Sequence, residues 1–191
     1  MNLPNKLTIA RCIMTFVFMV VLLLDFPFHY GVALLLFIAA SLTDYFDGKI
    51  ARRDNLITNL GKFLDPLADK VLTTAAFLGI MSELGSPAIL CWAVMLILTR
   101  EFMVTSVRLL AAKDGVVVAA SFAGKLKTVM QMVSIIYMLT AMQVVSLDIT
   151  TRGMNMGLLI TGILLIWVSV IATVVSGIQY VWALRHYFKE S

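Results

Sequence analysis

The chain has 191 residues, of which 61% are hydrophobic and 14% are charged, with a net charge of +4. Water-soluble domains contain about 45–50% apolar and about 25% charged residues, and a small protein has too little interior to bury this much apolar surface. The composition therefore argues against a water-soluble globule and predicts an integral membrane protein. The basic residues lie beside apolar stretches, which favours a membrane surface and anionic substrates over nucleic acid.

Six apolar stretches are long enough to cross a bilayer, wholly or with interruptions, since a transmembrane helix needs about 20 apolar residues. They are Leu7–Leu24, Gly31–Arg52, Leu60–Leu84, Ala88–Ala111, Ala123–Val145 and Met156–Leu184. No small-residue cleavage site follows the first stretch, so we interpret it as a retained helix rather than a signal peptide. The linkers are short, and residues 1–191 are expected to form one all-α transmembrane domain.

The distribution of basic residues predicts the orientation, because cytoplasmic loops are enriched in Lys and Arg. Basic residues surround the loops between the second and third stretches and between the fourth and fifth, and others follow the sixth stretch. The opposite loops contain only Arg152. Both termini are therefore expected to be cytoplasmic.

Four aspartates flank the loop between the second and third stretches. Asp44 and Asp47 are three residues apart, and Asp65 and Asp69 are four apart, so each pair shares one helical face. The two helices must run antiparallel, which lets the pairs meet at the same membrane depth. Carboxylates this close would repel or become protonated unless cations bound among them, and ligation by oxygen alone favours Mg²⁺ or Mn²⁺.

Small residues and an arginine accompany these aspartates. Gly48, Ala51 and Gly61 leave room for a substrate or a neighbouring helix to approach the backbone. Arg52 lies one turn beyond Gly48 and is suited to bidentate contact with phosphate oxygens. Carboxylates, a divalent metal, open space and an arginine together indicate a diphosphate-binding site at the cytoplasmic side.

The complete pattern resembles a known family. Asp-x2-Asp-Gly-x2-Ala-Arg-x8-Gly-x3-Asp-x3-Asp, from Asp44 to Asp69, matches the signature of the CDP-alcohol phosphatidyltransferases at all eight fixed positions. Residues 2–11, the run from 99–101 to 108–110, and residues 124–128 are similar to bacterial members that use glycerol 3-phosphate. The resemblance covers about two-thirds of the chain. The sixth stretch contributes a membrane span to it but no motif.

This resemblance implies a six-helix homodimer in the bacterial cytoplasmic (inner) membrane, with a polar cavity open to the cytoplasm. CDP-diacylglycerol would bind with its diphosphate at two divalent ions, Mg²⁺ or Mn²⁺. The implied metal ligands are Asp44, Asp47, Asp65 and Asp69. Asp69 would also act as the general base. The implied contacts to the CDP moiety are Asn5, Thr8, Gly48, Arg52 and Thr58.

An anionic acceptor alcohol needs further cations, and the sequence offers candidates near the cytoplasmic ends of the fourth and fifth stretches. Arg108, Lys125 and Lys127 are the candidate ligands of glycerol 3-phosphate. Arg100 and Glu101 lie deeper in the fourth stretch. Because neighbours on a helix do not face each other, we expect each to reach a different partner, such as Lys70 or another helix.

Three alternatives remain open from the sequence. A sister enzyme would use another acceptor, such as inositol phosphate, serine or phosphatidylglycerol. A small cation transporter would also place acids within the membrane, although here the four aspartates cluster at one side. A prenyl-diphosphate enzyme pairs aspartates with magnesium, but the segment from Gly48 to Arg52 has no role in such an enzyme.

Overall fold

The computed structural model describes residues 3–53, 59–85, 87–113 and 122–183. Within these ranges, the side chains of 3–4, 45–53, 59–66, 69, 87, 109–113 and 183 lie outside the description. The described helices are α1 (Leu3–Leu23), α2 (His29–Arg53), α3 (Asn59–Glu83), α4 (Pro87–Lys113), α5 (Phe122–Ser146) and α6 (Arg152–Ala183). The expected all-helical architecture is therefore confirmed, with helix bounds close to those of the six apolar stretches.

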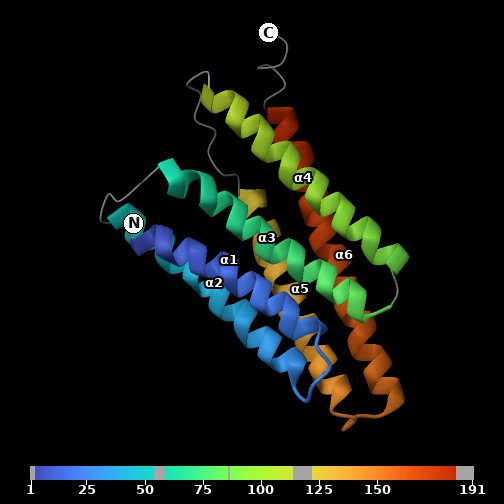
Figure 1. The fold of residues 1–191 in the computed structure, drawn as a ribbon. Coiled ribbons are helices and arrows are strands. Elements are labelled where there is room, and N and C mark those ends of the chain that lie inside the picture. The colour runs from blue at the N-terminus through green and yellow to red at the C-terminus, as the bar shows by residue number, and fades with distance from the viewer. Residues whose placement is uncertain (1–2, 54–58, 86, 114–121, 184–191) are drawn as a thin grey trace.

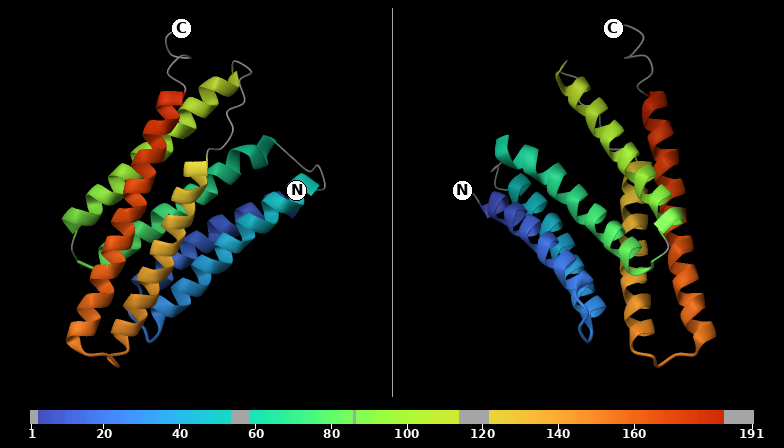
Figure 2. Two further views of the ribbon diagram at one scale, coloured as in Figure 1. Left: turned by 180° about the vertical axis from the view of Figure 1, so that it is seen from behind. Right: turned by 45° about the vertical axis from the view of Figure 1, so that its right-hand side comes forward.

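Successive helices run in opposite directions. The α1–α2, α3–α4 and α5–α6 connections lie at one end of the bundle, and the start of α1 and the end of α6 lie toward the other (Figure 1). Helix α1 packs against both α2 and α3, whereas α6 packs against α4 and α5 (Figure 2). Contacts of α2 with α5, and of α3 with α4 and α5, join these two groups of helices.

Each of the three connections at the first end contains a residue with a positive φ. These residues are Phe28 (φ 66°), Gly85 (φ 56°) and Asp148 (φ 51°). Glycine adopts this conformation without steric cost, and aspartate tolerates it, whereas a bulky residue such as Phe28 is uncommon there. The left-handed residues let the chain reverse direction within short connections.

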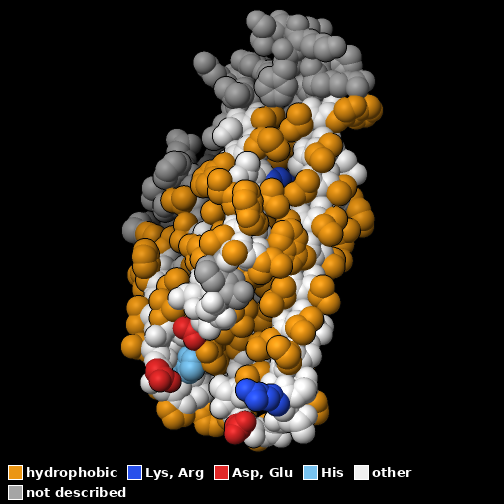
Figure 3. Space-filling model, turned by 90° about the vertical axis from the view of Figure 1, so that its right-hand side faces the viewer, with side chains coloured by type: hydrophobic (Ala, Val, Ile, Leu, Met, Phe, Trp, Pro, Cys, Tyr) orange, Lys and Arg blue, Asp and Glu red, His pale blue; other side chains and the backbone are white. Residues whose placement is uncertain are grey.

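Apolar side chains both fill the bundle and cover its surface. The core includes Phe18 and Phe37, whose ring centroids are 6.0 Å apart, with Ile80 and Met138 fully buried. Figure 3 shows a face covered mainly by hydrophobic side chains, with charged side chains gathered toward one end. A large exposed apolar surface of this kind fits lipid rather than water.

Four of the described helices are long and apolar enough to cross a membrane: Asn5–Leu23, Ala88–Arg108, Phe122–Ser146 and Arg152–Trp182. Within the described side chains, helix α2 contributes a shorter apolar segment, His29–Asp44. The first helical turns of α3 carry the charged residues of the aspartate motif, which lower its hydropathy. The expected six spans are therefore supported for four helices.

The packing of α1 on α3 requires a glycine. A Cβ built at Gly79 would lie 2.4 Å from Cδ2 of Leu22, whereas one built at Gly157 of α6 would meet nothing within 4 Å. Gly79→Ala should therefore destabilise the protein by about 1–3 kcal/mol through overpacking. The control Gly157→Ala should leave the thermal unfolding midpoint in detergent unchanged or slightly raised, and equal midpoints for the two variants would contradict this packing.

Candidate active site

The aspartate motif lies on two helices joined by a five-residue segment. Asp44 and Asp47 belong to α2, and Asp65 and Asp69 belong to α3. Both segments are helical, so the spacing within each pair of aspartates places its two residues on one face of the helix, as expected. The side chains of Asp47, Gly48, Arg52, Asp65 and Asp69, and the whole of Thr58, lie outside the described residues.

Asp44 is the member of the motif whose contacts are described. Nη1 of Arg11, on α1, donates a hydrogen bond to Oδ1 of Asp44 at 2.5 Å. The Arg11 side chain is fully buried, whereas that of Asp44 is 47% exposed. A buried guanidinium requires a compensating charge, and this carboxylate supplies it while remaining accessible to a ligand.

Helix α1 presents a polar face toward the motif. Asn5, Thr8, Arg11 and Thr15 recur every three or four residues, and all four are buried. The sequence-predicted residues Asn5 and Thr8 therefore share a helical face with the arginine that contacts Asp44. This face is the described part of the candidate CDP site.

The donor chemistry of the motif fits a hard divalent cation, because its four side chains are all carboxylates. Among the side chains that the structure describes, no three His, Cys, Asp or Glu residues gather into a possible metal site. Asp44 is the one motif aspartate in that set. The accessible carboxylate of Asp44 fits the expected role of a metal ligand.

A basic cavity of about 470 Å³ lies between α3, α4 and α5. The basic residues that line it are Lys70, Arg100, Arg108, Lys125 and Lys127. Glu101 is the acidic residue of this lining. Lys70 directly follows Asp69 along α3, so the lining of the basic cavity includes a chain neighbour of the aspartate motif. The structure thus brings together Arg108, Lys125 and Lys127, the three cations proposed from the sequence for the acceptor.

Glu101 joins two of the cations in this cavity. Its Oε1 accepts a hydrogen bond from Nη1 of Arg100 at 3.3 Å and also from Nζ of Lys127. Arg100 donates from Nη2 to Oγ of Ser176, on α6, at 2.7 Å. Arg100 therefore reaches α6 and Glu101 reaches α5, as expected. The expectation that these two neighbours would not face each other is wrong, because their side chains form an ion pair.

Lys125 and Lys127 differ in their surroundings. Lys125 is exposed at the cavity, whereas Lys127 is 7% exposed and pairs with Glu101. A buried ammonium needs this carboxylate to compensate its desolvation. Lys127 therefore reaches the cavity as part of an ion-pair network rather than as an isolated cation.

An apolar groove of about 370 Å³ lies next to the basic cavity. It runs between α1, α3 and α4 and includes Met19, Leu78 and Phe102. Lys70 and Glu101 line both this groove and the basic cavity. The charged lining of the basic cavity and the apolar lining of the groove therefore meet at these two residues.

Sequence reasoning missed the structural partners of the charged residues. The sequence gives Arg11 no role of its own within the segment 2–11, and it assigns topology alone to the stretch that forms α6. The signal for Arg11 was its place within an apolar stretch, where an unpaired charge is costly. Ser176 and Tyr180 gave no comparable signal, because serine and tyrosine occur in many membrane helices without a charged partner.

The chain belongs to the CDP-alcohol phosphatidyltransferase family, whose model matches residues 1–182. It is 40% identical to the CDP-diacylglycerol–glycerol-3-phosphate 3-phosphatidyltransferase of Bacillus subtilis, over 94% of this chain and 93% of that protein. It is 35% identical to the protein of the same name from Rickettsia bellii, over 98% and 97% of the two chains.

A third relative is the probable phosphatidylglycerophosphate synthase of Mycobacterium tuberculosis, at 36% identity over 94% of this chain and 80% of that protein. The family resemblance inferred from the aspartate signature is thus confirmed. Family membership favours a phosphatidyltransferase over the transporter and prenyl-diphosphate alternatives.

The Arg11–Asp44 ion pair is expected to stabilise the fold. Arg11→Ala removes a fully buried side chain and the partner of a half-exposed carboxylate, so it should cost on the order of 2 kcal/mol. Lys6→Ala, which removes an exposed lysine from the same helix, should change stability by less than about 0.5 kcal/mol. Thermal unfolding in detergent distinguishes them, and equal losses would refute the structural role of the pair.

Proposed function

We propose that this protein transfers the phosphatidyl group of CDP-diacylglycerol to the hydroxyl of glycerol 3-phosphate. The products are phosphatidylglycerophosphate and CMP, which makes this a step of phospholipid biosynthesis. The observation that carries the acceptor assignment is the basic cavity beside the aspartate motif. The names of the relatives from Bacillus subtilis and Mycobacterium tuberculosis support the same reaction.

In this proposal the aspartates hold the diphosphate end of the donor. Asp44, Asp47, Asp65 and Asp69 hold two divalent ions, Mg²⁺ or Mn²⁺. When bound, these ions would neutralise the diphosphate and stabilise the departing CMP. The residues assigned to the CDP moiety are Asn5, Thr8, Gly48, Arg52 and Thr58. Asn5 and Thr8 lie on the α1 face that carries Arg11, which contacts Asp44, and this placement supports their part of the assignment.

Asp69 is the proposed general base. A hydroxyl is a poor nucleophile, and a positioned carboxylate can accept its proton as the oxygen attacks phosphorus. The new bond joins this oxygen to the phosphorus that carries diacylglycerol, and the bond between that phosphorus and CMP breaks. Asp69 lies one helical turn beyond Asp65 and directly before Lys70, which lines the basic cavity. This order along α3 supports a base that acts between the donor and the acceptor.

Arg108, Lys125 and Lys127 are the proposed ligands of the acceptor phosphate. A phosphate dianion needs several cations, and these residues line one cavity with Lys70 and Arg100. A neutral acceptor such as serine would need fewer of them. The neighbouring apolar groove offers a surface of the right character for lipid chains.

We further propose that the chain spans the bacterial cytoplasmic membrane six times as a homodimer, with both termini in the cytoplasm. The antiparallel order of the helices and the four long apolar helices support this topology. The whole chain is proposed to act as one catalytic domain. The phosphorylated acceptor and CMP would then enter and leave on the cytoplasmic side.

The proposed reaction predicts release of CMP that depends on glycerol 3-phosphate. Purified protein would be incubated in detergent with CDP-diacylglycerol and Mg²⁺, with glycerol 3-phosphate, inositol phosphate, serine or phosphatidylglycerol added separately. Release with another acceptor would keep the phosphatidyltransferase class but overturn the acceptor. Cation flux through the protein, without CMP release in the presence of any acceptor, would instead support the transporter interpretation.

The aspartate roles predict two different defects. Asp69→Asn should retain Mg²⁺-dependent CMP binding but lose at least about 100-fold in turnover, because the general base is removed. Asp47→Asn should instead raise the Mg²⁺ concentration needed for CMP binding. Calorimetric titration with CMP and a turnover assay separate the two defects, and full activity in either variant would contradict its assigned role.

A further inference from the structure

Helix α6 carries a row of buried polar side chains within an otherwise apolar segment. Ser169, Thr173 and Ser176 are fully buried, and Tyr180 is 5% exposed. Their spacing of three or four residues places them on one helical face. Thr173 accepts a hydrogen bond from Nε2 of Gln131, on α5, at 3.1 Å. This face therefore points toward the other helices rather than toward lipid.

Ser176 contacts an arginine that lines the basic cavity. Nη2 of Arg100 donates to Oγ of Ser176 at 2.7 Å, while Nη1 contacts Glu101. Glu101 in turn pairs with Lys127. The hydroxyl of Ser176 thus anchors one end of a chain of polar contacts that crosses from α6 to α5.

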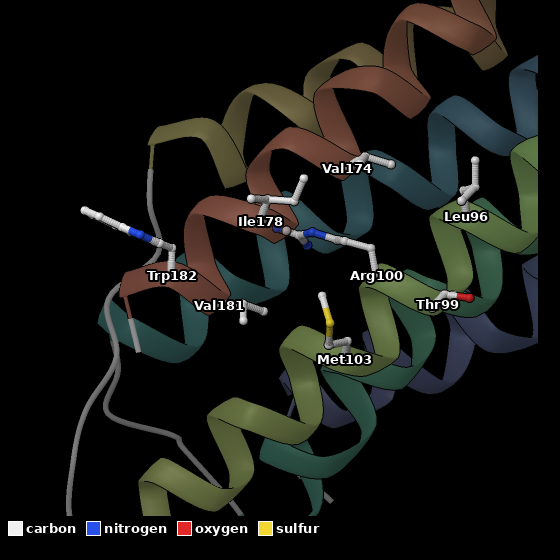
Figure 4. Close-up of a pocket in the computed structure, with 9 residues that line it drawn as sticks. Leu96, Thr99, Arg100, Met103, Val174, Ile178, Val181 and Trp182 are labelled. Carbon is white, nitrogen blue, oxygen red and sulfur yellow. The ribbon is translucent and has the colours of Figure 1, made fainter. Parts of the chain in front are cut away.

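Gly177 leaves space for the side chain of Arg100. A Cβ built at Gly177 would lie 2.8 Å from Cγ of Arg100, so any larger residue would displace the arginine. Figure 4 shows Arg100 extending from α4 toward α6, beside Ile178. The position of the guanidinium therefore depends on two consecutive residues of α6.

Tyr180 makes the corresponding contact with Arg108. Nε of Arg108 donates to the Tyr180 hydroxyl at 3.3 Å, and Cζ lies 5.4 Å from the ring centroid. The ring can therefore orient the guanidinium by hydrogen bonding and by cation–π attraction. Contact through Nε leaves the edge formed by Nη1 and Nη2 for a phosphate group.

We propose that Ser176 and Tyr180 are positioning residues for the acceptor phosphate, and that Gly177 gives Arg100 the space it needs. They hold the guanidinium groups of Arg100 and Arg108 at the wall of the basic cavity, so α6 contributes to acceptor affinity without contacting the acceptor. The inference rests on the proposed function. Donor binding is assigned to α1, α2 and α3, so it should respond much less to changes in α6.

Ser169 offers a matched control for Ser176. Both hydroxyls are fully buried on the same face, and both donate to a carbonyl of their own helix, Ile166 for Ser169 and Thr173 for Ser176. Ser176 also accepts from Arg100. Comparing Ser176→Ala with Ser169→Ala therefore isolates the contact with the arginine.

The kinetic test measures KM and kcat for both substrates. Ser176→Ala should raise KM for glycerol 3-phosphate roughly three- to tenfold, the effect of losing one hydrogen bond, with little change in KM for CDP-diacylglycerol. Ser169→Ala should leave both values near those of the wild type. Tyr180→Phe, which keeps the ring, should raise the acceptor KM less than Tyr180→Leu, which removes it.

A binding test does not depend on turnover. Titration of the metal-free wild type with inorganic phosphate should give a thermal shift, and Ser176→Ala and Tyr180→Leu should require several-fold more phosphate for the same shift. If the wild type fails to release CMP with glycerol 3-phosphate, the proposed function fails, but phosphate binding still decides this inference.

Two results would overturn the positioning role. One is equal acceptor KM and equal phosphate affinity for Ser176→Ala and Ser169→Ala. The other is a parallel rise of KM for both substrates, which would indicate general loosening of the bundle. If Ser176→Ala unfolds in detergent, the series Tyr180→Phe and Tyr180→Leu answers the same question through Arg108.

Discussion

A charge buried within an apolar helix bundle must be paired, because the surrounding medium cannot solvate it. This constraint organises the polar part of the protein. Arg11 of α1 contacts Asp44 of α2, and Glu101 of α4 contacts its neighbour Arg100 and also Lys127 of α5. Two of these ion pairs cross between helices, so the charged faces of α1 and α2, and of α4 and α5, lie toward each other.

The two groups of helices have different chemical characters. Helices α1, α2 and α3 carry the aspartate motif and its buried arginine, whereas α4 and α5 supply most of the basic cavity. Lys70, directly after Asp69, brings the two regions together on α3. Such an arrangement suits the proposed transfer between two anionic substrates, because the aspartate motif and most of the basic residues belong to different helices.

Much of this architecture can be predicted from the sequence. Apolar length defines the helices, and the spacing of Asp44 and Asp47 fixes their common face. Positive charge near helix ends indicated Arg108, Lys125 and Lys127. The interhelical partners could not be predicted, because the pairing of Arg11 with Asp44, or of Arg100 with Ser176, depends on how distant helices pack.

Arg100 also lines an apolar groove of about 480 Å³ between α4 and α6, together with Met103, Ile178 and Trp182 (Figure 4). The side chain of Arg100 therefore belongs to the linings of both an apolar groove and a charged cavity. Replacing it with alanine would remove the one side chain that these two linings share, and we expect the apolar and the charged spaces to lie closer together in that variant.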